Sequence, residues 1–228
     1  MLSNMARFLM VSAAASFVAL GSAPADACVD ISDTALDLIA DTTPVASGAV
    51  FFTAVQKAAF GYTNTDIAVL WGNVSPNSAL YFDNFFAVAP ATTHFTEITN
   101  VANIAAGDVL ILDATASYSG HTAIITGPVT QVSPALSPVY ATTKQWALPI
   151  ADSTTSKHGC SVAYPDSRCV GGVFTAGEGT AFMRLYADDV TGVPGGHTWS
   201  VASVSASSYY SISDRPFKIG RLTPCPPL

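Results

Sequence analysis

GDVLILDATASYSGHTAIITG, residues 107–127, is the stretch that decides the fold class of this chain. Two apolar runs flank a short polar segment, which is the pattern of two β-strands joined by a hairpin. Further strand-like runs follow along the chain, separated by Gly, Pro, Ser and Asn. The expected strands cover residues 108–113, 121–126, part of 139–150, 180–187, 198–204 and 217–222. The succession of short strands in this half of the chain therefore predicts an antiparallel meander.

Three helix-like segments come before the strands, at residues 30–43, 47–60 and 77–88. Ser47 is suited to cap the second segment and Gly61 to end it. The third segment is so aromatic that a strand remains an alternative there. Helices followed by strands predict an α+β class, with N-terminal helices packed on an antiparallel sheet.

The N-terminus has the features of a cleavable signal peptide spanning residues 1–27. Arg7 supplies a positive charge, residues 8–20 form an apolar run too short to span a bilayer, and Ala25-Asp26-Ala27 fits a cleavage site. A lipid-modified Cys28 is an alternative, although Ala25 and Asp26 are poor residues before such a cysteine. We therefore expect a single domain at 28–228, secreted or held in the periplasm or cell envelope, with no transmembrane segment.

The composition excludes several classes of protein. Half of the residues are hydrophobic and only 11% are charged, which argues against a disordered chain and against a long-helix protein. The net charge is −7 and Lys and Arg do not cluster, so nucleic acid is not an expected partner.

Four cysteines remain after cleavage at Ala27, and an even count in an exported chain predicts two disulfides. Three pairings are open. We favour Cys160–Cys169, which closes a short loop, and Cys28–Cys225, which joins the two ends. No Cys-x-x-Cys pair is present and the four histidines are scattered, so neither a metal nor another cofactor is expected.

His121 and Asp152 are the residues that carry a chemical signal. His121 opens an expected strand, and Asp152 lies near the end of another within IADSTTSKHG, residues 150–159. If the strands are neighbours, the carboxylate can orient the imidazole so that its other nitrogen accepts a proton from a nucleophile. The alternatives are a half-buried structural histidine and a carboxylate that serves a turn.

The runs GDVLIL and GHTAIIT, at residues 107–112 and 120–126, resemble the strand pair of the NlpC-type branch of papain-like cysteine hydrolases, with the CHAP branch as close kin. The resemblance covers roughly residues 40–222 and implies a papain-like (NlpC-type) fold. It also implies that His121 occupies the position of the catalytic histidine and Asp152 that of the residue orienting it. His158 belongs to a stretch similar to some uncharacterised bacterial relatives, which makes it a candidate ligand-binding residue.

The chain departs from this family where the nucleophile should be. The family's helix begins Asp-Cys-Ser-Gly, whereas residues 45–50 here read VASGAV. Ser47 and Gly48 keep the Ser-Gly, but Ala46 fills the nucleophile position and has no lone pair with which to attack a carbonyl. Ser47 is turned about 100° around the helix from that position. We therefore expect Ser47 to be a ligand-binding residue rather than a replacement nucleophile.

The resemblance and its departure together lead to a function hypothesis. We expect a secreted, catalytically degenerate relative that binds a cell-envelope or extracellular ligand such as peptidoglycan, a glycan or a peptide. One alternative is an active cysteine peptidase or amidase that cleaves peptidoglycan or related amides. Another is an unrelated secreted β-rich structural protein in which the two short motifs are coincidence.

Overall fold

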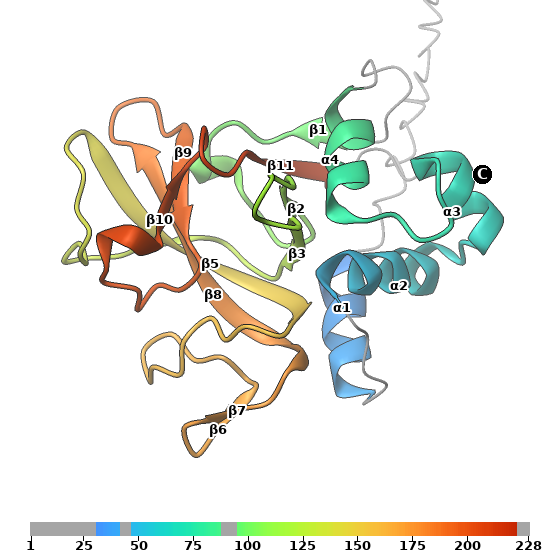
Figure 1. Ribbon diagram of the computed structural model, residues 1–228, viewed down its shortest axis with the longest axis horizontal. Helices are drawn as coiled ribbons and strands as arrows, with labels where there is room; N and C mark the ends of the chain where they lie inside the picture. The colour runs from blue at the N-terminus through green and yellow to red at the C-terminus, as the bar shows by residue number, and fades with distance from the viewer. Residues whose placement is uncertain (1–30, 42–46, 88–94, 223–228) are drawn as a thin grey trace, which may run out of the picture.

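The computed structural model describes residues 31–41, 47–87 and 95–222. Within them, four N-terminal helices pack against a curled antiparallel sheet, which confirms the predicted α+β class (Figure 1). The expected signal peptide, Ala46, and the expected Cys28–Cys225 disulfide lie outside the described residues. None of the described helices is long and apolar enough to cross a membrane.

The helices are α1 (Ile31–Ala40), α2 (Gly48–Phe60), α3 (Asn64–Trp71) and α4 (Ser78–Ala87). Three of them match the predicted segments, and α3 was not predicted. Ser47 caps α2 by accepting a hydrogen bond from the Val50 amide, and Gly61 ends the helix in a left-handed conformation. Such caps satisfy backbone groups that have no partner inside the helix.

The main sheet has the strand order β1-β11-β2-β3-β5-β8-β9-β10, with β4 beside β5. Its strands are β1 (Phe95–Glu97), β2 (Val109–Leu112), β3 (His121–Ile125), β4 (Thr130–Gln131), β5 (Thr143–Thr154), β8 (Gly177–Asp188), β9 (Pro194–Thr198), β10 (Tyr209–Ser211) and β11 (Phe217–Leu222). A separate hairpin joins β6 (Cys169–Val170) to β7 (Val173–Phe174), and two short 3-10 helices are η1 (Val101–Asn103) and η2 (Ala206–Ser208).

The prediction of a strand over residues 198–204 is wrong. Strand β9 ends at Thr198, and the chain then turns. The Thr198 hydroxyl donates to the Ser200 carbonyl, and the Ala202 amide donates to the Ser200 hydroxyl. Serine and threonine side chains that bond to nearby backbone favour such turns over a strand ladder.

Strand β2 lies at the centre of the fold and separates two hydrophobic clusters. Val109 and Ile111 face the cluster that contains α2, whereas Leu110 and Leu112 face the opposite cluster. Side chains alternate between the faces of a strand, so all four can be buried only because both faces are covered. This burial fixes the register of β3, where His121 pairs with Leu112.

Gly48, the first residue of α2, touches β3 more closely than a larger residue could. A Cβ atom at this position would clash with the Thr122 carbonyl oxygen and would lie 2.7 Å from Cε1 of His121. The start of α2 therefore approaches the head of β3 because residue 48 has no side chain.

We expect Gly48→Ala to lower the free energy of unfolding by about 1–3 kcal/mol, the usual cost of inserting a methyl group where there is no room. Urea denaturation measures this change. The matched control is Gly195→Ala on β9, where a Cβ atom would have nothing within 4 Å. Equal, small effects of the two substitutions would contradict the close packing of α2 on β3.

Candidate functional site

His121 and Asp152 come together as the sequence predicts. Nε2 of His121, at the head of β3, lies 2.7 Å from Oδ2 of Asp152, near the end of β5. These strands pair antiparallel, which brings the two side chains to the same place in the sheet. Asp152 is fully buried and His121 is nearly so.

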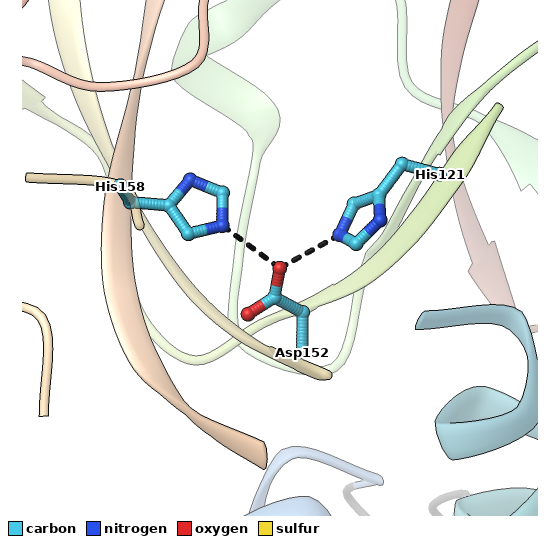
Figure 2. Close-up of side chains that lie close together, drawn as sticks. All are labelled: His121, Asp152 and His158. Carbon is cyan, nitrogen blue, oxygen red and sulfur yellow. Dashed lines mark hydrogen bonds and ion pairs between the residues drawn. The ribbon is translucent and has the colours of Figure 1, made fainter. Parts of the chain in front are cut away.

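Asp152 is the centre of a larger group of polar side chains. Figure 2 shows its Oδ2 between two imidazoles, with Nε2 of His158 at 2.9 Å on the side opposite His121. Its other oxygen, Oδ1, accepts a hydrogen bond from Nη1 of Arg168 at 2.9 Å. Burial alone would raise the pKa of Asp152, but the charge of His158 and the hydrogen bonds from both histidines hold that pKa well below its usual range.

The contacts of His158 determine where its protons are. Its Nδ1 lies 2.6 Å from the carbonyl oxygen of Trp199, and its Nε2 faces the carboxylate of Asp152. Both neighbours are acceptors, so both contacts are hydrogen bonds only if His158 carries a hydrogen on each ring nitrogen. The ring of His158 is therefore held between two acceptors on opposite sides.

A disulfide closes the loop that supplies the remaining members of the group. Cys160 and Cys169 are bonded, which confirms that part of the predicted pairing. Between them, Asp166 accepts hydrogen bonds from Nε of Arg168 at 2.7 Å and from the backbone amide of His158 at 2.9 Å. Two acids thus face the guanidinium of Arg168 and the ring of His158 in the buried group. This pairing offsets the large cost of removing charges from water.

The imidazole of His121 is oriented for proton acceptance at its second nitrogen. Because Nε2 faces the carboxylate of Asp152, the tautomer that donates this hydrogen bond has its lone pair at Nδ1. A Cβ atom on Gly48 would lie 3.0 Å from this Nδ1, so the nitrogen faces the start of α2. The Trp199 ring meets the His121 ring edge-on, with centroids 4.8 Å apart, and stacks on His158 at 4.1 Å. Among the described residues, His121 Nδ1 has no hydrogen-bond partner.

Two hollows adjoin His121, with volumes of about 440 and 270 Å³. Both are lined by the residues at the start of α2 and the head of β3, namely Ser47, Gly48, Ser119, Gly120 and His121. We call the two hollows together the His121 cleft. Most of the other polar groups in the larger hollow are hydroxyls of serine, threonine and tyrosine. The His121 ring therefore lies in the wall of a mainly polar cleft.

The same cluster offers ligand atoms for a metal, since one atom each of His121, Asp152 and His158 lies within 4.8 Å of the others. Two donors of a tetrahedral zinc lie about 3.3 Å apart, given metal–ligand bonds of 2.0–2.1 Å. Both imidazole nitrogens are nearer than that to Oδ2 of Asp152, at 2.7 and 2.9 Å. The atoms would have to separate to admit zinc, so the arrangement fits a hydrogen-bonded network better.

The other residues singled out by the sequence occupy different places. Ser47 lines both hollows, although its hydroxyl also caps α2. The side chain of His158 has no exposed surface and lines neither hollow. Ala46, the expected nucleophile position, is outside the described residues.

Sequence reasoning missed three members of the site: Asp166, Arg168 and Trp199. No sequence pattern placed Arg168 beside the carboxylate behind His121. The available signal was the segment DSRC at 166–169, which places an acid and an arginine beside a cysteine in a short closed loop. No sequence pattern around Trp199 indicated that its ring would contact His121.

We expect Arg168→Met to lower the free energy of unfolding by about 3–5 kcal/mol, because it leaves Asp152 and Asp166 with a buried negative charge in excess. The matched control is Lys144→Met, which removes one positive charge from an exposed position and should change stability by less than about 0.5 kcal/mol. Urea denaturation at neutral pH compares the two. A cost below about 1 kcal/mol for Arg168→Met would contradict the charge network.

No protein-family model matches the chain, and no curated protein or solved structure is significantly similar to it. A fold by itself does not specify a function, because one architecture serves many activities. The function of the chain must accordingly be argued from the geometry around His121.

Proposed function

We propose that the protein is a papain-like, NlpC-related hydrolase that has lost its nucleophile and binds a ligand in the His121 cleft. The observation that supports this is the orientation of His121. Its Nε2 is held by buried Asp152, and its Nδ1 faces the start of a helix. A cysteine–histidine hydrolase needs this arrangement, in which a third residue orients the base toward a nucleophile at a helix start.

The residues at that helix start do not supply a strong nucleophile. The sequence there is Ala46-Ser47-Gly48. Alanine and glycine have no nucleophilic atom, and the Ser47 hydroxyl accepts a hydrogen bond from the Val50 amide. The sulfurs of Cys160 and Cys169 are joined in a disulfide. The described residues around the cleft include no free thiol, and we therefore propose that the protein is a degenerate enzyme.

The cleft retains features suited to ligand binding. The first amides of α2 at Gly48 and Ala49 face no partner within the helix, and both residues line the smaller hollow. Hydroxyls line the larger hollow, and the Trp199 ring forms part of its wall. Amides, hydroxyls and an aromatic ring suit a polar ligand such as peptidoglycan, a glycan or an extracellular peptide.

An exported location is part of the same proposal. The Cys160–Cys169 disulfide supports it, because such bonds persist mainly outside the reducing cytoplasm. A ligand of the cell envelope or the extracellular space would be available to a protein placed there.

The intact His121–Asp152 pair also favours a second candidate, an active cysteine peptidase or amidase. That candidate requires a reactive thiol next to His121, for example from Cys28. Iodoacetamide treatment of the folded protein distinguishes the two proposals. A degenerate protein should take up no label and show no hydrolysis of peptidoglycan. Hydrolysis that disappears both on labelling and in His121→Ala would establish the active enzyme instead.

We expect Ala46→Cys to create a thiol whose pKa is below the usual value of about 8.5, because the proposed kinship assigns residue 46 to the nucleophile position beside the histidine. The pH dependence of its alkylation rate by iodoacetamide measures this pKa. Adding His121→Gln, which keeps a donor for Asp152, should return the pKa toward the usual value. The control is Val162→Cys, at a fully exposed position. A normal pKa for the Ala46→Cys thiol would contradict the proposed kinship.

A further inference from the structure

We propose that Arg215 anchors a carboxylate of the ligand in the His121 cleft, so that the ligand is a short peptide with a free carboxylate. The inference rests on the proposed function, namely that this cleft binds a ligand, and it names the chemical class. Arg215 lines the larger hollow together with His121. It lies between η2–β10 and β11, in a part of the chain that carried no predicted site residue.

The guanidinium of Arg215 is held between two aromatic rings. Its Cζ lies 3.5 Å from the centroid of the Tyr210 ring and 4.1 Å from that of the Tyr118 ring. Tyr210 belongs to β10, and Tyr118 to the hairpin between β2 and β3. Cation–π contacts of this kind fix the position of the charge, but they leave its hydrogen-bond donors available.

Within residues 31–41, 47–87 and 95–222, no carboxylate lies within 4.0 Å of the Arg215 side chain, and no hydrogen bond from its guanidinium is found. The adjacent carboxylate, on Asp214, instead accepts hydrogen bonds from the amide and hydroxyl of Ser211. The charge of Arg215 therefore lacks a counter-ion in the described part of the chain.

The other arginines of the described residues differ from Arg215. Arg168 and Arg221 are paired with carboxylates, and Arg184 is buried and donates to carbonyl and side-chain oxygens. Arg215 alone among them combines a fixed guanidinium, free donors and a place in the wall of a cleft. In a chain with a net charge of −7, it makes this cleft a local site for an anion.

A carboxylate fits this site better than a phosphate does. Arginine binds both groups through two parallel hydrogen bonds. However, Arg215 is the one arginine or lysine side chain lining the larger hollow, and most of the other polar groups there are hydroxyls. One guanidinium balances the single charge of a carboxylate, whereas a phosphate dianion would retain excess negative charge.

The positions of Arg215 and His121 in one hollow suggest how the ligand lies. The carboxylate would bind Arg215, and the polar chain attached to it would extend past the hydroxyls toward His121 and the start of α2. A short peptide has this combination of a terminal anion with amides and carbonyls. A neutral glycan lacks the anion and would make no use of Arg215.

The test is a titration of the whole protein with N-acetyl-Ala-Ala that has a free C-terminal carboxylate, followed by NMR of the histidine ring signals. We expect the signals of His121 to shift. The same peptide with a C-terminal amide should bind at least about tenfold more weakly, since a charged hydrogen-bonded pair contributes more than about 1.4 kcal/mol. Inorganic phosphate, the third probe, should bind more weakly than the free acid.

Substitutions assign the effect to Arg215. Arg215→Gln should weaken binding of the free acid at least about tenfold, and Lys144→Gln, with the same loss of charge at an exposed position, should not. Tyr118→Ala removes one of the two rings that hold the Arg215 guanidinium and should weaken binding of the free acid. Circular dichroism and urea denaturation verify that each variant is folded.

Two classes of result would overturn the inference. Equal binding of the acid and the amide, or unchanged binding by folded Arg215→Gln, would refute the role of Arg215 while leaving ligand binding by the cleft intact. Phosphate binding as tightly as the acid, or no binding of the acid at millimolar concentration, would refute a carboxylate ligand. The thiol pKa of Ala46→Cys is independent of all of these results, so failure of the proposed kinship would be seen separately.

Discussion

The fully buried carboxylate of Asp152 is the group on which the site depends. It accepts hydrogen bonds from His121 on β3, from His158 after β5 and from Arg168 in the disulfide-closed loop. A buried charge is costly unless it is paired and hydrogen-bonded, so these three segments must meet for the fold to tolerate it. The same requirement fixes the ring of His121, and with it the direction of Nδ1.

The fold and the cleft are connected through this carboxylate and through Gly48. The Cys160–Cys169 disulfide holds the loop that carries Arg168, and Arg168 and His158 hold Asp152. On the other side of His121, the missing side chain at Gly48 lets α2 approach β3. Structural features therefore account for an oriented imidazole facing a helix start.

The sequence predicted the parts of the structure that depend on local pattern. The pair His121 and Asp152 was found because each stands near an end of a recognisable strand. Helix α3 was missed because it is only eight residues long, although Thr63 and Asp66 form a capping box that signals its start. The partners of Asp152 in the loop, and the stacking of Arg215 between two rings, join residues from separate segments. Pairings of that kind depend on tertiary packing, which single-sequence patterns do not record.

Long-range proton–nitrogen NMR correlations of the histidine rings test the central claim most directly, because they reveal which ring nitrogens carry hydrogens. The account predicts that both rings carry a hydrogen on Nε2, the nitrogen that faces the carboxylate of Asp152. The spectrum of Asp152→Asn should differ for both rings. A hydrogen on Nδ1 of His121 with none on Nε2, or an Nε2 of His158 without a hydrogen, would contradict the network around Asp152 and the base-like orientation of His121.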